Sequence, residues 1–302
     1  MKILSSKKIY SILVFGMIFL PSSVLASSVY IQTNHSEFFE GDTIMFSVQI
    51  DSEGKNINAV EGEVLLDYAA DEASLIDINT AGSKFSLWPN KPFPSESNTS
   101  ISFVGGSPGN LMSKDAIVFN LVLKLQKTGQ ITLSPNNIGV YLNDGKGSKD
   151  EVSAKDLIIN VLPKKSDAQP ADDWSTIILN DKTAPESFEI ALGKDPSIFD
   201  NQYFISFFTA DAESGSGVAY YEVREGEKDF VRAESPYLLQ DQSLKNLIKV
   251  KAIDKAGNER VVKMSATLYK TLSFWIMVGI VLVVIIIIVW MIINKIKNKN
   301  EK

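Results

Sequence analysis

In this sequence of 302 residues, most side chains that could act in catalysis or bind a metal carry oxygen atoms. The chain has 36 aspartate and glutamate residues, a single histidine, His35, and no cysteine. Without cysteine there is no thiolate metal site, no cysteine nucleophile and no disulfide framework, and one histidine leaves little material for a histidine-dependent triad. No spacing marks two of the carboxylates as a glycoside-hydrolysing pair. These observations predict a protein that is not an enzyme.

One acidic segment has the composition of a calcium-binding loop. Residues 143–151, NDGKGSKDE, contain the calcium candidates Asp144 and Asp150. An EF-hand requires oxygen ligands at positions 1, 3, 5 and 12 with glycine at position 6, and this spacing does not deliver them. Asn, Asp and Gly are also typical of a hairpin turn, which is the interpretation we favour. A second acidic set, Asp211, Glu213 and Asp254, could likewise hold calcium, although residues 214–217, SGSG, favour an ordinary loop there. No other cofactor is expected.

Three aromatic residues lie in or beside a segment punctuated by prolines. Phe85, Trp88 and Phe93 are interspersed with Pro89 and Pro92. Exposed rings on a β sandwich stack on the apolar faces of sugars, while nearby amide and carboxylate oxygens bond the hydroxyls. The alternative is a loop that folds its rings over the edge of the core. The segment therefore predicts either a glycan-binding site or a cover for the core.

The elements that must position these side chains are strands, because apolar residues recur with a period of two. Residues 44–50 alternate apolar and polar side chains, which is typical of a strand with one buried face. Many short strands without amphipathic helices between them predict an antiparallel sandwich, so the fold class is all-β. The other strands predicted before the first domain ends are 60–66, 75–78, 100–104, 117–125, 131–133, 138–142 and 157–161.

The strand predicted at 117–125 offers a candidate protein-binding face. Its odd-numbered residues form the core-facing set, and the opposite set is Val118, Asn120, Val122 and Lys124. A mixed apolar and polar face without heavy charge suits the centre of an interface, where charged residues are depleted. The alternative is that Val118 and Val122 are covered by a loop of their own domain.

The composition divides the region outside the termini into two domains. Residues 27–163 form the first sandwich, and 164–182 have the proline, charge and small residues of a linker. An apolar patch in this linker, around Trp174, predicts a first strand of the next domain or a pad between domains. Residues 183–269 carry a second pattern of six or seven strands, which is the size of an immunoglobulin-like sandwich.

The N-terminus has the organisation of a secretory signal peptide over residues 1–26. Lysines precede an apolar stretch, which a proline then interrupts. We predict cleavage between Ala26 and Ser27. The acidic balance of the chain, with a net charge of −6, repels phosphate backbones, so no nucleic-acid partner is expected.

The C-terminus has the organisation of a membrane anchor. Residues 274–293 contain no charge and have the length of a transmembrane helix, which we predict over 272–293. Trp275 and Trp290 lie near its ends, and a lysine-rich tail follows at 294–302. Positive charge stays on the inner side, so we expect a single-pass protein of the cell membrane with its ectodomain outside and its C-terminus in the cytoplasm.

Residues 29–162 resemble a cohesin domain, a jelly-roll sandwich related to carbohydrate-binding modules. The resemblance lies in the order of its motifs, which include Gly41-Asp42-Thr43, Leu65-Leu66-Asp67-Tyr68, Gly105-Gly106 and Thr128-Gly129. Cohesins use one sheet face for protein recognition, so the resemblance implies a dockerin-like protein partner. Its relation to carbohydrate-binding modules implies a polysaccharide as the alternative ligand.

The second domain resembles bacterial Ig-like repeats. These open with Asp-x-Thr-x-Pro, here Asp181, Thr183 and Pro185, and close with Ala-x-Asp-x-Ala-Gly-Asn, here 252–258. Such repeats imply a spacer. We therefore expect a membrane-anchored extracellular binding or adhesion protein whose cohesin-like domain is raised from the bilayer. The alternatives are a carbohydrate-binding receptor linked to polysaccharide utilisation and a purely structural envelope protein.

Overall fold

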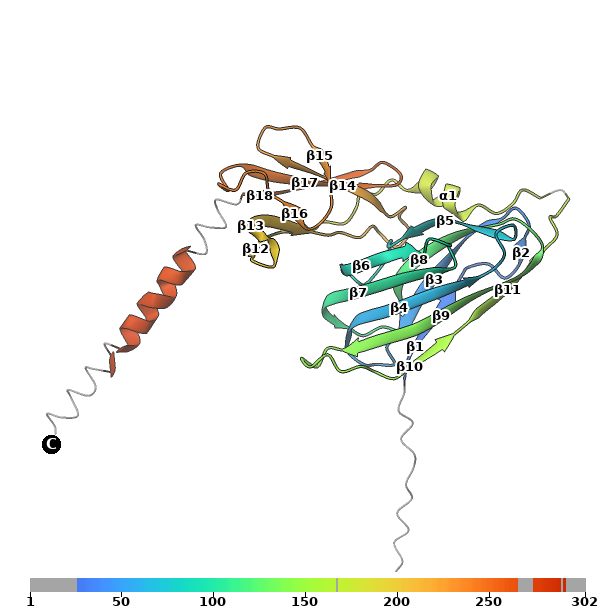
Figure 1. Ribbon diagram of the computed structural model, residues 1–302, viewed down its shortest axis with the longest axis horizontal. Coiled ribbons are helices and arrows are strands. Elements are labelled where there is room, and N and C mark those ends of the chain that lie inside the picture. Colours follow the sequence, from blue (N-terminus) through green and yellow to red (C-terminus); the bar gives the residue numbers. More distant parts are fainter. Residues whose placement is uncertain (1–25, 167, 266–273, 289, 292–302) are drawn as a thin grey trace, which may run out of the picture.

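Alternating apolar residues build the first β sandwich, as their period predicted. The computed structural model describes residues 26–166, 168–265, 274–288 and 290–291 (Figure 1). The strands of the first sandwich are β1 (Ser27–Gln32), β2 (Phe38–Phe39), β3 (Thr43–Asp51), β4 (Ile57–Asp67), β5 (Ala73–Asn79), β6 (Leu87–Pro94), β7 (Ser100–Leu111), β8 (Ala116–Leu125), β9 (Gly129–Leu142), β10 (Val152–Lys155) and β11 (Leu157–Leu162).

These strands form two sheets that share one apolar core. The five-stranded sheet has the order β10-β1-β3-β8-β5, and the six-stranded sheet has the order β2-β11-β9-β4-β7-β6. Most pairs are antiparallel, whereas β1 with β10 and β2 with β11 are parallel. The sheets meet through side chains such as Phe103 of β7 and Phe119 of β8, whose ring centroids are 5.1 Å apart. The predicted all-β sandwich is confirmed for this domain.

Two differences from the predicted strands have a local cause. The strands predicted at 131–133 and 138–142 are one strand, β9, because the pairing with β4 continues across a bulge between Glu61 and Glu63. Gly62 occupies that bulge with φ of 151°, where an added Cβ would lie 2.5 Å from Ile138 Cδ1. The proline-punctuated segment predicted as a loop is strand β6, which lies at a sheet edge where proline is tolerated.

The second domain is a smaller β sandwich with its own core. Its strands are β12 (Ile190–Asp195), β13 (Ile198–Phe207), β14 (Val218–Glu225), β15 (Val231–Ala233), β16 (Tyr237–Leu238), β17 (Leu247–Asp254) and β18 (Glu259–Ser265). They form a sheet of order β12-β13-β16 and a sheet of order β15-β14-β17-β18. Buried side chains from both sheets, including Ile205, Val223 and Val250, form one cluster.

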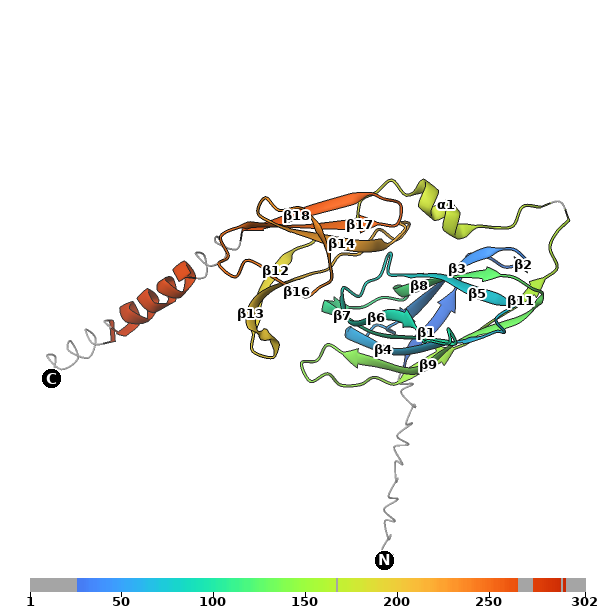
Figure 2. The same cartoon turned by 45° about the horizontal axis from the view of Figure 1, so that its top comes forward.

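The linker contains a helix, so the prediction of a first strand around Trp174 is wrong. Helix α1 (Asp173–Asn180) begins after Asp172, whose side chain accepts a hydrogen bond from the N–H of Ser175 at 2.9 Å. Trp174, Ile177 and Ile178 have the i, i+3, i+4 spacing of a helix face, which a short apolar run does not distinguish from a strand. In both views α1 lies over the first sandwich and to one side of the second (Figures 1 and 2).

The predicted membrane anchor extends beyond the described residues. Residues 274–288 are helical. No helix within the described part of the chain has both the length and the hydropathy needed to cross a membrane. The predicted signal peptide, except Ala26, and the whole of the predicted basic tail lie outside the described residues.

Candidate functional site

The structure corrects the predicted binding face on β8. Val118 and Val122 are fully buried and Asn120 is 2% exposed, whereas Lys124 is exposed. Three of the four side chains therefore offer no surface to a partner. Val118 belongs to the core cluster of the first sandwich, beside a register shift in the pairing of β8 with β3, so it does not lie on the face predicted for it. The alternative, in which a loop of the same domain covers this face, applies to Asn120.

The loop after β5 provides that local cover. Ser83 Oγ donates a hydrogen bond to the carbonyl of Val118 at 2.7 Å. The side-chain amide of Asn120 donates to the carbonyl of Ala81 at 2.9 Å and to Asn79 Oδ1 at 3.2 Å. These bonds satisfy the buried amide nitrogen of Asn120 and hold the loop across the outer side of β8.

Helix α1 and the second sandwich cover the rest of the face. The cross-strand neighbours of Val122 are Met45 on β3 and Asp77 on β5. The N–H of Met45 donates to Asp173 Oδ2 at 2.9 Å, and the other carboxylate oxygen of Asp173 lies 2.9 Å from His35 Nε2. The first turn of α1 is therefore fixed to the first sandwich by its acidic residue.

Lys255 connects the second sandwich to the same place. Its ammonium contacts both carboxylate oxygens of Asp77, lies 3.3 Å from the carbonyl of Ile78 and is 5.1 Å from the ring centroid of Trp174. The N–H of Gly82 donates to the carbonyl of Asp211 at 3.1 Å. The first sandwich therefore contacts α1 through Met45 and the second sandwich through Asp77 and Gly82. We call this set of contacts the interdomain junction.

The three aromatic candidates do not form a platform for a sugar. Phe85 is fully buried in the core, whereas Phe93 is 50% exposed. Trp88 is half-buried, with its ring centroid 6.5 Å from that of Phe85. Gly105 allows this packing, because a Cβ there would lie 2.7 Å from the indole. The indole N–H of Trp88 is buried and has no hydrogen-bond partner among the described residues.

A groove of about 710 Å³ lies between β6 and the second sandwich. The side chains of β6 alternate between exposed and half-buried, and Leu87 is 52% exposed on the open side. We call this cavity the interdomain groove. Its apolar lining consists of Leu87, Trp88, Pro89 and Pro108 from the first sandwich and Ala191, Phe207, Phe208 and Pro236 from the second.

The calcium candidates Asp144 and Asp150 do not converge on one site. Asp144 Oδ1 accepts the N–H of Lys146 at 2.8 Å, and hydrogen bonds from Ser148 and from this backbone group lower the pKa of Asp144 to about 2. Asp150 instead pairs with Lys55, 2.7 Å away. The hairpin-turn interpretation is confirmed, because Gly145 and Gly147 have positive φ within this turn.

Three other carboxylates do converge, and we call them the carboxylate cluster. Asp181, Asp211 and Asp254 each place one oxygen within 4.8 Å of the other two, and all three residues are buried. Asp181 follows α1, Asp211 follows β13 and Asp254 ends β17. Hard cations such as calcium prefer oxygen ligands of this kind.

Each carboxylate is also held by backbone N–H groups. Ser216 donates to Asp181 at 2.8 Å, Gly217 donates to Asp211 at 2.8 Å, and the N–H of Asn258 donates to Asp254 at 2.8 Å. The sequence identified Asp211 and Asp254 as neighbours but paired them with Glu213 instead of Asp181. The sequence did contain a pattern that could have identified Asp181. The opening motif of the second domain begins with Asp181, and the closing motif contains Asp254.

The cluster separates the pKa values of its members. Burial raises the pKa of Asp211 to about 6, aided by the charges of Asp181 and Asp254 and opposed by backbone hydrogen bonds. Burial also acts to raise the pKa of Asp181, but hydrogen bonds from Ser216 and Thr183 hold it below its usual value. The stability of the second sandwich therefore depends on pH through this cluster.

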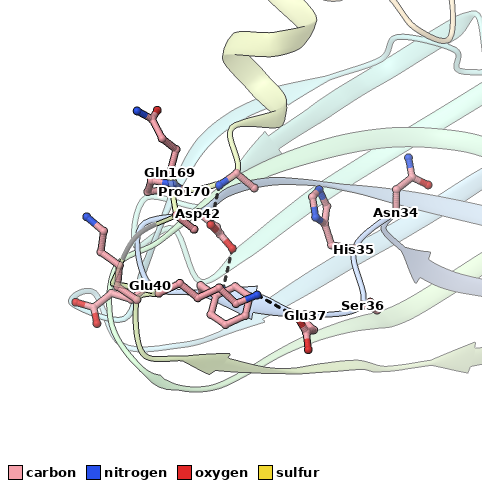
Figure 3. Close-up of a pocket in the computed structure, with 13 residues that line it drawn as sticks. Asn34, His35, Ser36, Glu37, Glu40, Asp42, Gln169 and Pro170 are labelled. Carbon is pink, nitrogen blue, oxygen red and sulfur yellow. Dashed lines mark hydrogen bonds and ion pairs between the residues drawn. The ribbon is translucent and has the colours of Figure 1, made fainter.

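A separate cavity of about 350 Å³ lies where the linker crosses the turn between β2 and β3 (Figure 3). Asp42 accepts the N–H of Phe39 and the N–H of Ala171, both at 2.8 Å. The Lys165 ammonium lies 3.4 Å from the Glu37 carboxylate and 4.1 Å from the Phe39 ring centroid. These groups fasten the linker to the first sandwich, which explains their placement without a ligand.

Among the comparisons with known proteins, only the comparison with solved structures found similar proteins. No protein-family model matches the sequence, and no curated protein matches it. A cohesin module from a family 33 glycoside hydrolase of Clostridium perfringens is similar over 46% of this chain and 98% of its own length, with 14% identity and a TM-score of 0.36. A non-cellulosomal cohesin from Archaeoglobus fulgidus is similar over 46% of this chain and 92% of its own, with 16% identity and a TM-score of 0.36. The third ScaB cohesin of R. flavefaciens, solved in complex with a group 1 dockerin, is similar over 46% and 97%, with 19% identity and a TM-score of 0.35.

Proposed function

We propose that this protein is a membrane-anchored extracellular binding protein that holds a segment of a partner protein in the interdomain groove. The observation that carries the proposal is the groove itself, which has the size of a ligand site and a mostly apolar lining from both sandwiches. The second sandwich is then part of the binding site as well as a spacer. The anchor and the export signal are supported by the sequence of the two termini.

The chemistry of the groove favours a protein segment over a glycan. An apolar groove lined by aromatic and proline side chains suits an extended peptide, because extended proline-rich segments dock in aromatic-lined grooves of this kind. A glycan platform needs coplanar exposed rings, and Phe85 is in the core. The sequence resemblance to cohesins also supports a protein partner, and we propose a dockerin-like partner for that reason.

A matched pair of variants tests this proposal. Leu87→Asp places a charge in the groove, and Ile158→Asp places the same charge on β11, at the opposite side of the same sheet; the two side chains are 52% and 57% exposed. The full-length protein in detergent is screened against a displayed peptide library and a glycan array. We expect peptide enrichment that Leu87→Asp abolishes and Ile158→Asp preserves. Binding to glycans alone, or equal loss in both variants, would contradict the proposal.

A further inference from the structure

The residue that follows the predicted signal cleavage point is buried against a carboxylate. Ser27 is fully buried and is the first residue of β1. It pairs with Val152 of β10 in parallel register. Asp150 lies just before β10, so the pairing of β1 with β10 brings its side chain to the beginning of β1.

Asp150 is bonded to both polar groups of Ser27 and to a lysine. Ser27 Oγ donates to Asp150 Oδ2 at 2.7 Å, and the N–H of Ser27 is 3.4 Å from the same oxygen. The Lys55 ammonium donates to the two carboxylate oxygens at 2.7 and 2.9 Å. The Asp150 side chain is 8% exposed, so this carboxylate has a fixed environment rather than a solvated one.

We propose that Asp150 is the receptor for the α-ammonium group that signal removal creates at Ser27. Hydrolysis of the Ala26–Ser27 bond consumes one water, leaves a carboxylate on Ala26 and releases an amine on Ser27 that takes up a proton. A positive charge at this buried position needs a nearby counter-charge, and Asp150 supplies it. The uncleaved amide has one hydrogen and no charge, so it makes the weaker contact.

Removal of the signal peptide thereby strengthens the attachment of β1 to the first sandwich. In the cleaved chain, Asp150 joins the new N-terminus, Lys55 in the turn before β4 and, through its own backbone, β10. The inference depends on the predicted cleavage after Ala26 and is independent of what the interdomain groove binds. A negative result here therefore leaves the proposed function untouched.

The test compares two forms of the chain that differ by one residue. Protein beginning at Ser27 and protein beginning at Ala26, both extending to Lys302 and both in detergent, are melted between pH 6 and pH 10. We expect the Ser27 form to have a Tm about 2–4 °C higher at pH 7. The advantage should be present at pH 7, where a free α-amine is largely protonated, and absent at pH 10, where it is neutral.

Two controls keep the result interpretable. Asp150→Asn in both forms should remove the difference between them, and Lys149→Ala, a change at the adjacent residue, should leave it in place. If Asp150→Asn does not fold, the rate of cyanate addition to the Ser27 amine serves instead, and it should be slower in the folded protein than in protein unfolded by guanidinium chloride. Equal melting of the two forms at every pH, or equal cyanate rates in the folded and unfolded states, would overturn the inference. So would a native N-terminus other than Ser27 by mass spectrometry.

Discussion

Whether Val122 is exposed or buried depends on residues outside its own strand. The sequence placed it on the face of β8 opposite the core, and that placement is correct. Its full burial comes from residues far away in the sequence, because its neighbours Met45 and Asp77 are bonded to Asp173 and Lys255. A period-two pattern identifies the face of a side chain, but it carries no information on what later packs against that face.

Substitution of Val122 therefore tests burial rather than binding. We expect Val122→Asp to destabilise the protein by about 3 kcal/mol or more, because a buried carboxylate there has no partner. Lys124→Asp on the same face of the same strand should change stability by less than about 0.5 kcal/mol, because Lys124 is exposed. Urea unfolding followed by circular dichroism measures both, and a folded, equally stable Val122→Asp protein would contradict the assignment.

Asp211 gives the second sandwich a defined pH dependence. Its pKa is raised to about 6 in the folded protein, from an ordinary value of 3.8. The folded state then holds more protons than the unfolded state between these values, so stability should fall as the pH rises from about 4 to 6. The expected loss is of order 2–3 kcal/mol from this group alone.

The measurement is a series of melts in EDTA, so that no divalent cation masks the titration. Asp211→Asn should remove the fall between pH 4 and 6, whatever its effect on overall stability. Asp195→Asn is the matched control, because Asp195 has a lowered pKa and lies outside the cluster. A fall of equal size in Asp211→Asn would assign the titration to another group.

At the scale of elements, strands were predictable and their partners were not. Strands β3 and β8 were expected within one residue of their observed limits, because each has a long apolar pattern, whereas β4 begins three residues before its predicted start at Val60. Strand β6 was missed because its prolines are typical of loops, although an edge strand tolerates them. Helix α1 was missed because eight residues are too few for a helical period to stand out.

The candidate site depends on contacts that no local pattern reports. The interdomain groove needs both the edge position of β6 and the attachment of the second sandwich beside it. The sequence could indicate the aromatic and proline content of β6, and Trp88 does line the groove. It could not indicate Phe207 or Phe208, because their role depends on how the two domains are joined.

Lys255 should control how firmly the two sandwiches are joined. Lys255→Ala removes the ion pair with Asp77, so we expect the amide of Gly82, bonded to the carbonyl of Asp211, to exchange about tenfold faster. A tenfold change corresponds to roughly 1.4 kcal/mol. Hydrogen exchange read by mass spectrometry with residue resolution measures it.

Lys251→Ala is the control for this experiment. Lys251 is similarly covered but pairs with Glu222 and Glu259 inside the second sandwich, so exchange at Gly82 should not change. The amide of Lys84, bonded to the carbonyl of Ile117 within the first sandwich, should be constant in every variant. Unchanged exchange at Gly82 in Lys255→Ala would mean that other contacts hold the junction.

At the scale of the whole molecule, the termini and the two sandwiches suggest one arrangement at the cell surface. If the signal and the anchor act as their sequences predict, both sandwiches face the exterior. Protease added to intact cells should then remove residues 27 to about 271, leaving a membrane-bound fragment that carries the lysine tail. Digestion that requires lysis of the cells would contradict this orientation, and a cytoplasmic marker protein controls for leakage.

The most direct test of the central claim is photocrosslinking from within the interdomain groove of the full-length protein in its own cells. A benzophenone amino acid replaces Leu87, which lines the groove, and in a parallel strain it replaces the equally exposed Ile158. We predict a discrete adduct from position 87 that protease destroys and glycosidases leave intact, with no such adduct from position 158. Adducts from both positions, none from position 87, or an adduct that only glycosidases remove would contradict the claim that the groove binds a protein partner.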